Sequence, residues 1–405
     1  MASQDKILQQ LLQQEEERQR NTLSLIASEN YAPAEIRQLC ASVLMNKYAE
    51  GLPGKRYYAG CTVVDEVESL AIDRCKKLFG VQHANVQPHA GSQANQAAYL
   101  ALLKPGDTIL GMSLSSGGHL THGQKVNFSG TFYNPVLYTV DPATETLNYD
   151  ALEKLAHEHK PKLIIAGASA YARTIDFARF AQIARSVNAL LLVDMAHIAG
   201  LIAAKLHPDP APHADIITST THKTLRGPRG AFIACKAPYA GTIDKSVMPG
   251  IQGGPFMNVI AAKAHCFELA AQPEFVTYQR QVIANAQHLA KTLSTLGWRI
   301  VAGGTDTHLF VVDLAQKLTG KAAETALEKA GITVSRSTIP GDTQPPTIGS
   351  GIRLGTPAVT TRGMKEAEMA MIAQWIDEVL KNAGDERKLA VIADEVQKLA
   401  NRFST

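Results

Sequence analysis

The central part of the chain alternates between two patterns of apolar residues. Short runs rich in Ile, Val and Leu recur between stretches in which apolar residues return every three or four positions. The intervening stretches predict helices, for example at residues 67–78, 95–103, 149–158 and 177–187. The short runs predict strands at residues 84–87, 108–112, 135–138, 163–166, 190–194, 216–219 and 231–235. This order predicts an α/β fold with a mostly parallel, seven-stranded sheet that helices cover on both faces.

The N-terminal sixty residues follow a different pattern. Ile7, Leu8, Leu11 and Leu12 recur at helical spacing and predict a short amphipathic helix that packs on another surface, such as a second subunit. From residue 30 to 60, prolines, glycines and polar side chains predict an extended, loop-rich arm. We therefore expect residues 1–64 to form an N-terminal helix and arm.

The C-terminal third predicts a second, smaller domain. A loop rich in Gly and Pro at 249–255 is followed by a long helical region at 259–296. Short apolar runs at 309–313 and 351–355 and two closing helices come after it. We therefore expect a large α/β domain at 65–272 and a smaller α+β domain at 273–405.

Composition narrows the class of protein. Of the 405 residues 19% are charged and the formal net charge is only +3, which fits an ordinary globular enzyme rather than a disordered chain. No block of basic residues indicates nucleic acid or an acidic membrane surface, and no apolar run is long enough to span a bilayer. The five cysteines lack metal-ligand spacing, and the N-terminus resembles neither a secretory signal nor a transit peptide. We expect a soluble, cytoplasmic protein.

Two candidate catalytic residues follow neighbouring predicted strands. Asp194 ends the run 190–194, and Lys223 comes shortly after the run 216–219. In a parallel sheet both side chains lie at the same edge, where open α/β folds bind ligands. Pyridoxal phosphate requires a Lys that forms a Schiff base and an Asp that pairs with the pyridinium nitrogen. Taken singly, a Lys such as Lys223 is usually a solvated surface residue. Asp194 alone is explained about as well by a strand-end cap as by a functional role.

A turn of small residues precedes one of the predicted helices. Gly91 and Ser92 lie between the run 84–87 and the helical stretch from residue 95. Amide groups at the start of a helix, helped by the helix dipole and a Ser hydroxyl, form a site for an anion. Alone, Ser92 is better explained as an ordinary helix cap. Combined with the residues above, the turn favours a phosphate site, because the phosphate, the ring and the aldehyde of the cofactor must be held together.

Two polar loops supply further candidates. His119 and His122 lie in a glycine-rich loop, but no carboxylate or cysteine accompanies them at ligand spacing. We therefore expect no metal and interpret an imidazole as stacking on the cofactor ring. In the arm, Tyr48, Glu50 and Tyr58 bring acid–base groups into a loop that has no apolar periodicity. Tyr57 and Tyr58 are equally well explained as plain interface aromatics.

An arginine lies inside a predicted strand of the smaller domain. Arg353 follows Ile352 in the run 351–355. A guanidinium away from the surface needs a carboxylate, because its fork matches two oxygens. We expect Arg353 to bind the carboxylate of a substrate.

Together these segments closely resemble the serine hydroxymethyltransferases, pyridoxal-phosphate enzymes of the aspartate aminotransferase-like group (fold type I). The resemblance runs nearly end to end, from residues 25–30 to beyond residue 353. It is most specific at 46–51 (NKYAEG), 53–58 (PGKRYY), 117–123 (GGHLTHG), 193–197 (VDMAH) and 220–225 (TTHKTL).

The resemblance implies roles for particular residues of this chain. Those expected to bind pyridoxal 5'-phosphate are Lys223 as its point of attachment, Asp194 at the ring nitrogen, His119 on the ring face, Ser169 and His197 near the phenolic oxygen, and Gly91 and Ser92 at the phosphate. Those expected from a partner subunit are Gly253 and Gly254 at the phosphate, together with Tyr48, Glu50 and Tyr58. The residues expected to take part in catalysis are Lys223, Glu50, Tyr58, His222 and Thr220.

The resemblance also implies where the substrates bind. Ser28 and Arg353 are expected to take the carboxylate of the amino acid, with Tyr58 also at the substrate. The co-substrate tetrahydrofolate is expected at Leu114, Gly118, His119, Leu120, Gln344, Pro345 and Pro346. A homodimer with shared active sites is expected, and a tetramer would share the same sites.

The implied activity is the reversible conversion of L-serine and tetrahydrofolate into glycine and 5,10-methylenetetrahydrofolate. Folate-independent aldolase activity on 3-hydroxy amino acids could accompany it. The rival enzymes are an aldolase or an aminotransferase of the same fold, and the arm at residues 48–58 argues against a pure aminotransferase. The rival from another class, a catalytically silent binding protein, would have lost Lys223, Asp194 or Arg353, and all are present.

Overall fold

The chain divides into two compact units. We describe residues 5–314 and 317–403 of a computed structural model. The larger unit is Ala32–Arg280, and the smaller combines Met1–Tyr31 with Gln281–Thr405. The expected division into three parts at residues 64 and 272 stays a prediction, and the two units are described separately below.

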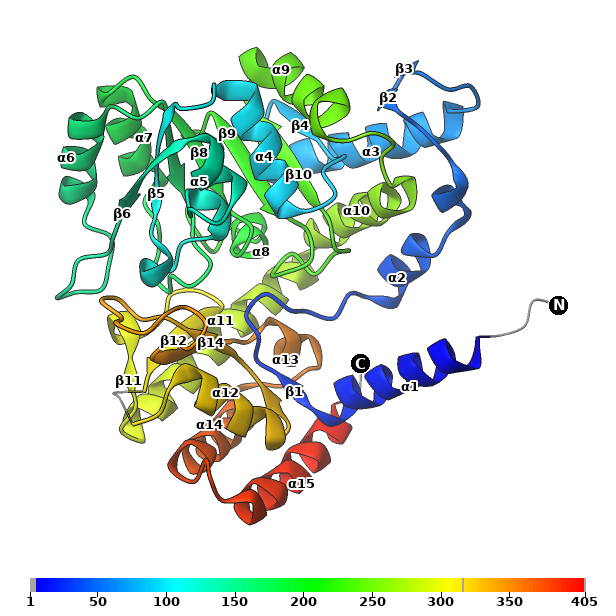
Figure 1. Cartoon of the computed structure of the whole chain (residues 1–405). Coiled ribbons are helices and arrows are strands. Elements are labelled where there is room, and N and C mark those ends of the chain that lie inside the picture. The colour runs from blue at the N-terminus through cyan, green and yellow to red at the C-terminus, as the bar shows by residue number, and fades with distance from the viewer. Residues whose placement is uncertain (1–4, 315–316, 404–405) are drawn as a thin grey trace. The chain divides into compact units, whose positions relative to one another are not determined.

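The larger unit is built on a seven-stranded sheet (Figure 1). In spatial order its strands are β4 (His83–Asn85), β10 (Ala231–Cys235), β9 (Ile216–Thr220), β8 (Leu190–Asp194), β7 (Leu163–Ala166), β5 (Thr108–Met112) and β6 (Asn134–Tyr138). The strands from β9 to β6 are parallel, and β10 is antiparallel to both of its neighbours. The mostly parallel sheet and the α/β class are therefore confirmed.

The central strands are buried on both faces, as a sheet covered by helices requires. Every residue of β7, β9 and β10 is buried. On one face the alanines of α4 (Gly91–Leu102) pack on the apolar side chains of the strands. The other helices of this unit include α3 (Thr62–Phe79), α6 (Tyr149–His159), α7 (Phe177–Ser186), α8 (Ala199–Ala203) and α10 (Met257–Ala270). Four predicted strands have the observed bounds, and the other three differ by one or two residues at one or both ends.

The prediction of one long helical region at 259–296 is wrong in one respect, because this stretch forms two helices. The first, α10, ends at Ala270, and α11 (Pro273–Thr295) begins at a proline. Proline has no N–H to continue the preceding helix, but its fixed φ suits the first position of a new one.

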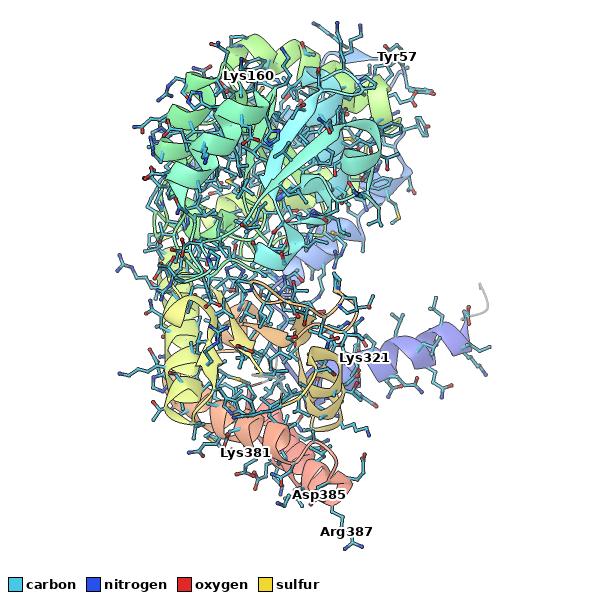
Figure 2. All side chains as sticks on the ribbon, turned by 60° about the vertical axis from the view of Figure 1, so that its left-hand side comes forward. Tyr57, Lys160, Lys321, Lys381, Asp385 and Arg387 are labelled. Carbon is cyan, nitrogen blue, oxygen red and sulfur yellow. The ribbon has the colours of Figure 1, made fainter. Side chains whose placement is uncertain are left out.

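The arm contains α2 (Ala34–Cys40) and a short hairpin of β2 (Gly51–Leu52) and β3 (Lys55–Arg56). Gly51 has φ +105°, and a Cβ there would collide with the carbonyl oxygen of Lys55, so this position requires glycine. Tyr57, labelled in Figure 2, follows the hairpin and is 73% exposed.

The smaller unit is an α+β structure, as expected. Its antiparallel sheet has the order β11 (Arg299–Ile300), β12 (Leu309–Asp313), β15 (Gly351–Gly355) and β14 (Ser335–Ser337). A separate parallel pair joins β1 (Leu23–Ser24) to β13 (Ile332–Thr333). The helices of this unit include α1 (Lys6–Asn21), α12 (Gly320–Lys329), α13 (Pro357–Thr361), α14 (Glu366–Lys381) and α15 (Glu386–Arg402). The predicted apolar stripe of α1 is exposed, since Ile7, Leu8, Leu11 and Leu12 are each more than half accessible.

Within the described ranges, no helix combines the length and the apolar composition needed to cross a membrane.

Candidate active site

The structure brings Asp194 and Lys223 to one edge of the larger unit's sheet. Asp194 is the last residue of β8 and lies opposite Thr218 of β9 in a parallel ladder. Lys223 follows the end of β9 by three residues. Both side chains therefore leave the sheet at the carboxyl ends of adjacent parallel strands, which is where this class of fold forms its sites.

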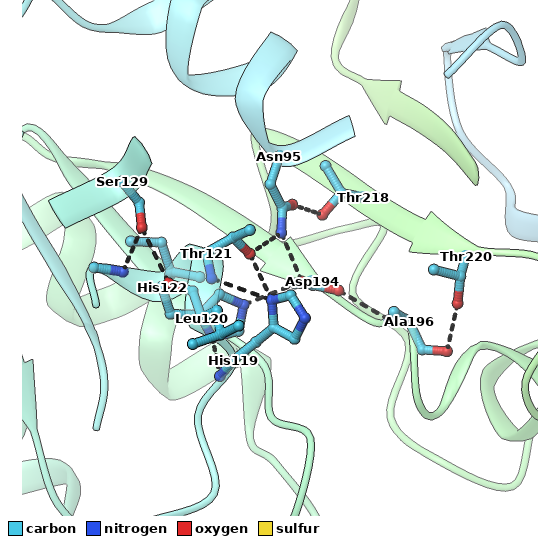
Figure 3. A network of polar contacts seen from close by, with 12 residues as sticks. Asn95, His119, Leu120, Thr121, His122, Ser129, Asp194, Ala196, Thr218 and Thr220 are labelled. Carbon is cyan, nitrogen blue, oxygen red and sulfur yellow. Dashed lines mark hydrogen bonds and ion pairs between the residues drawn. The ribbon is translucent and has the colours of Figure 1, made fainter. Parts of the chain in front are cut away.

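Asp194 is surrounded by hydrogen-bond donors (Figure 3). One carboxylate oxygen accepts from His122 Nε2 at 3.0 Å and from Asn95 Nδ2 at 2.8 Å, and the other accepts from the backbone N–H of Ala196 at 3.1 Å. Burial alone would raise the pKa of Asp194, but the hydrogen bond and charge of His122, the charge of His119 and the hydrogen bond of Asn95 together hold it well below its usual range. The carboxylate is thus kept ionised inside the protein.

Asn95 and His122 both donate to Asp194, and neither was assigned a role from the sequence. Asn95 also donates to Thr121 Oγ1 (2.7 Å) and accepts from Thr218 Oγ1 (2.6 Å), so its orientation is fixed. A sequence signal for Asn95 existed, since it is a polar residue on the alanine-rich inner face of a helix. No local signal links His122 to Asp194, because the two residues are 72 positions apart.

The start of α4 is open toward an anion. Its N-cap is Ala90, which has extended backbone and no side chain that can cap the helix. The predicted pair Gly91 and Ser92 occupies the first two helical positions. A Cβ at Gly91 would lie 2.8 Å from Thr220 Cγ2, so glycine lets the helix start approach the end of β9. Thr220 itself donates to the carbonyl of Ala196 at 3.3 Å.

Two further loops meet at the same edge. The backbone N–H groups of Ser169 and Ala170 both donate to the carbonyl of Gly117, at 2.7 and 3.0 Å. This ties the loop after β7 to the loop that carries His119. The His119 ring is held by Thr121, whose Oγ1 lies 2.8 Å from Nδ1. The loop that carries Ser169 is therefore joined to the loop that carries His119.

The segment after Lys223 is fixed from two sides. Thr224 Oγ1 accepts from the backbone N–H of Gly200 (2.9 Å) and donates to the carbonyl of His197 (2.8 Å). From α11, Gln279 Nε2 donates to the carbonyl of Thr224 at 2.6 Å. Arg226 has a left-handed backbone (φ +60°), and its guanidinium lies 4.4 Å over the ring of Tyr278. These contacts orient the backbone that carries Lys223.

His222 is a neutral imidazole in this setting. Burial and the neighbouring charges of Arg229 and Lys223 lower the pKa of His222 to about 3. Its Nε2 lies 3.4 Å from Arg229 Nη1 and so accepts, which leaves the proton on Nδ1. No hydrogen-bond partner for that buried Nδ1 lies among the described residues.

A second cluster gathers Tyr48, Glu50 and Tyr58 around Gly253 and Gly254. The rings of Tyr48 and Tyr58 pack edge to face at 5.1 Å, and Tyr48 Oη lies 3.5 Å from Glu50 Oε1. A Cβ at Gly253 would lie 2.9 Å from the Glu50 carboxylate, and one at Gly254 would lie 3.3 Å from the Tyr48 ring. The charge of Glu50, followed by burial, raises the pKa of Tyr58. The five residues expected to complete the active site of a partner subunit thus lie together in one chain.

Arg56 holds this cluster in place. Its Nη1 donates to the carbonyls of Ala49 (2.9 Å) and Gly51 (2.8 Å), which flank Glu50. The guanidinium also forms ion pairs with Asp65 at 2.7 Å and Glu68 at 2.6 Å. A fixed backbone on both sides of Glu50 gives its carboxylate a defined direction.

The remaining predicted residues lie in loops of the larger unit or in the smaller unit. Leu114, Gly118 and Leu120 belong to the loop that follows β5. In the smaller unit, Arg353 lies in the middle of β15, and burial lowers its pKa to about 10, so it stays charged. Ser28 lies in a segment that the hydrogen bond from Gly355 N to the carbonyl of Leu25 (2.8 Å) joins to the end of β15.

The predicted folate residues Gln344, Pro345 and Pro346 lie in a loop of the smaller unit. Asp342 orders this loop, because its carboxylate accepts from Gln344 N at 2.8 Å and from Ser350 Oγ at 2.7 Å. The three residues are exposed.

The family model described as serine hydroxymethyltransferase matches residues 1–376 of this chain. The chain belongs to the serine hydroxymethyltransferase family. Members of this family are pyridoxal-phosphate-dependent transferases of fold type I that use tetrahydrofolate and act in one-carbon and glycine metabolism. The resemblance seen in the sequence is thereby confirmed.

The residues at the sheet edge fit pyridoxal phosphate chemically. The uncapped start of α4 offers free N–H groups to a dianionic phosphate. Asp194 stays ionised despite its burial and can therefore hold a proton on a ring nitrogen. Lys223 supplies an amine on the neighbouring strand end. Within the described ranges, no group of three His, Cys, Asp or Glu side chains is arranged to hold a metal ion.

Proposed function

We propose that the protein catalyses the reversible transfer of the hydroxymethyl carbon of L-serine to tetrahydrofolate, which gives glycine and 5,10-methylenetetrahydrofolate. The observation that carries the proposal is the meeting of an ionised, buried Asp194, an amine at Lys223 and an uncapped helix start at one sheet edge. These are three anchors for one cofactor, in a chain of this family.

Each anchor has a defined task in the proposal. The N–H groups at Gly91 and Ser92 bind the phosphate, and Lys223 is the point of attachment. Asp194 keeps the ring nitrogen protonated, since its own low pKa makes it a hydrogen-bond acceptor at any working pH. His119 covers the ring, while Ser169 and His197 bind near its phenolic oxygen. Bound pyridoxal phosphate supplies an electron sink for the α-carbon of the amino acid.

The substrate contacts come from other residues. Arg353 and Ser28 bind the carboxylate of serine, since a charged guanidinium suits two carboxylate oxygens. Glu50 holds or moves a proton at the hydroxymethyl group and at the folate nitrogens, and Tyr58 assists as a hydrogen-bond donor. His222 and Thr220 flank Lys223, and His222 remains uncharged. The folate lies against Leu114, Gly118, His119, Leu120, Gln344, Pro345 and Pro346.

The active form in this proposal is a homodimer with shared sites. Tyr48 and Tyr58 are each about half exposed, and both lie beside Glu50. A second copy would bring this cluster to the Lys223 edge of its partner, and the exposed apolar stripe of α1 supports such packing. A tetramer would contain the same pair of shared sites. All five cysteines are free, which fits a reducing, cytoplasmic setting.

The decisive test is a formaldehyde-transfer assay with purified protein, L-serine and tetrahydrofolate. We expect serine cleavage that depends on both pyridoxal phosphate and tetrahydrofolate. Cleavage of 3-hydroxy amino acids without folate would be a slower side activity on the same site. Serine cleavage that ignores tetrahydrofolate would instead assign the protein as an aldolase of this fold.

A variant gives the matched control. Glu50→Gln should lose most folate-dependent turnover but keep cofactor binding, because it keeps the size of the side chain beside Gly253 and leaves Asp194 and Lys223 unchanged. Full folate-dependent turnover in Glu50→Gln would remove Glu50 from the mechanism.

A further inference from the structure

Lys263 carries a buried amine that the proposed function does not use. The residue comes from α10 and is 1% exposed. Its Nζ donates to the carbonyl oxygens of Val86 at 2.6 Å, Pro88 at 3.0 Å and Ala231 at 2.8 Å. An ammonium has three N–H donors, so each donor has one main-chain acceptor. The charge is thus held by carbonyl dipoles that converge from two separate segments.

Those two segments both lead to the cofactor anchors. Val86 and Pro88 follow β4 and precede the turn at Gly91. Ala231 is the first residue of β10 and lies opposite Thr220 at the end of β9, just before Lys223. The N–H of Ala231 also donates to the carbonyl of Pro88 at 3.2 Å. One amine therefore joins the phosphate turn to the strand pair that carries the attachment lysine.

The absence of a side chain at Gly230 leaves room for the Lys263 side chain. A Cβ at Gly230 would lie 2.6 Å from Lys263 Cε and 3.3 Å from Nζ. The end of a lysine can usually swing away from such a contact. Here three hydrogen bonds fix the amine, so a methyl group at residue 230 would have to displace it from its carbonyls.

The titratable groups that face the amine come from two elements besides α10. Burial lowers the pKa of Lys263 to about 7, while the charge of Glu68 on α3 raises it. Cys75 on the same helix is a neutral thiol, because burial raises its pKa. In the turn after β4, burial and then the charge of Lys263 lower the pKa of His89. On α10 itself, Cys266 is buried, and its raised pKa keeps it a neutral thiol. A neutral Lys263 amine would have only two N–H groups for the three carbonyls, so all three hydrogen bonds form only when the amine is charged.

We propose that Lys263 is a positioning residue for the cofactor phosphate: its ammonium holds the turn after β4 against β10, and thereby sets the start of α4 relative to Lys223. The proposal rests on the proposed use of Gly91 and Ser92 as the phosphate site. It assigns Lys263 no contact with the cofactor. Its effect passes through main-chain carbonyls only.

The test compares two ligands that differ only in the phosphate. Full-length protein stripped of cofactor is titrated with pyridoxal phosphate and with pyridoxal, by absorbance, for the unaltered chain and three variants. Lys263→Met should lose at least about tenfold in affinity for pyridoxal phosphate, because a small misplacement of a binding group has effects of this size. Its affinity for pyridoxal should change by less than about threefold. Gly230→Ala keeps the amine but displaces it, and should show the same selective loss.

The control variant is Phe267→Leu, one turn further along α10. Phe267 is buried against Phe79 and Phe232, so the change weakens the packing of the same helix without touching the amine. We expect it to lower the unfolding temperature and to leave the preference for pyridoxal phosphate over pyridoxal unchanged. In the unaltered chain that preference should decline as the pH rises through about 7, more than it does in Lys263→Met.

The outcomes separate the two proposals. An unaltered chain that does not prefer pyridoxal phosphate over pyridoxal would overturn the phosphate site and the role of Lys263 with it. If the unaltered chain has the preference and Lys263→Met keeps it, only the role of Lys263 is overturned. Equal losses for both ligands would also overturn it, since they indicate general damage. If Lys263→Met fails to fold, Gly230→Ala decides, and an unchanged preference in that variant overturns the proposal.

Discussion

Asp194 shows how single donors decide the charge of a buried carboxyl. Burial pushes its pKa up, yet His122, Asn95 and a backbone N–H hold it down. Because the folded-state pKa lies below the unfolded value, the carboxylate contributes stability above about pH 4 that is lost as the pH falls toward the folded-state pKa. The strength of that contribution depends on the donors rather than on Asp194 alone.

Replacing His122 with Phe should therefore destabilise the protein in a pH-dependent way. We expect a loss of about 1–3 kcal/mol at pH 6, the usual cost of removing a hydrogen bond to a buried charge. The deficit relative to the unaltered chain should narrow as the pH falls below about 4. The variant has the higher folded-state pKa at Asp194 and takes up its proton first, while the unaltered chain continues to lose stability. Urea unfolding of the cofactor-free protein at several pH values measures this. A deficit that is constant with pH would mean that His122 acts only through packing.

His222 changes the stability with pH in the same direction as Asp194, but in a higher pH window. Its pKa of about 3 lies below the value of about 6.5 for an unfolded histidine, so the unfolded state binds more protons between these two pH values. Stability must then fall as the pH falls through this window. His222→Gln removes the effect, and its stability should improve relative to the unaltered chain by about 1–2 kcal/mol between pH 6.5 and pH 5. Parallel stability curves for the two proteins over this range would show that His222 titrates normally.

At the scale of elements, the start of α4 combines a structural cost with a binding function. Ala90 has the extended backbone of an N-cap residue but no side chain to satisfy the first N–H groups of the helix. A phosphate can satisfy them instead. The helix start is thus weaker without its ligand than an ordinary capped helix.

Ala90→Asp should strengthen the start of α4 and weaken its binding of the phosphate. The new carboxylate should cap α4 and stabilise the cofactor-free protein by about 0.5–2 kcal/mol. It should also weaken pyridoxal phosphate binding by at least about tenfold, because it occupies the same N–H groups and repels the phosphate. Thermal unfolding and a cofactor titration measure the two effects. Ala90→Ser, a cap without charge, serves as the control and should weaken binding less. Tighter cofactor binding in Ala90→Asp would contradict a phosphate at this helix.

The sequence predicts some of these elements and their ends, but not the contacts between residues far apart in the chain. The strands were found because buried parallel strands are continuous runs of Ile, Val and Leu, and their ends located Asp194 and Lys223. The antiparallel direction of β10 and the break before Pro273 have weaker local signals. Asn95, His122 and Lys263 act on residues 99, 72 and up to 177 positions away, so their partners become visible only in the fold.

At the scale of the whole molecule, the proposed reaction uses two clusters of the larger unit. Lys223 and Asp194 lie at the sheet edge, and Glu50 lies with Tyr48, Tyr58 and Gly253 in the arm cluster. In the proposed dimer each site takes its first cluster from one subunit and its second from the partner. Two different inactive variants can then complement each other.

Mixing Lys223→Ala with Glu50→Gln tests this arrangement. Each homodimer should have little folate-dependent turnover, because every site lacks one of the two groups. In a randomly mixed dimer population half of the dimers are hybrids, and each hybrid has one site with both groups intact, so about a quarter of the full turnover should return. The subunits are mixed in mild denaturant, dialysed, and assayed with serine and tetrahydrofolate. A mixture whose turnover equals the mean of the two separate variants would mean that each chain completes its own site.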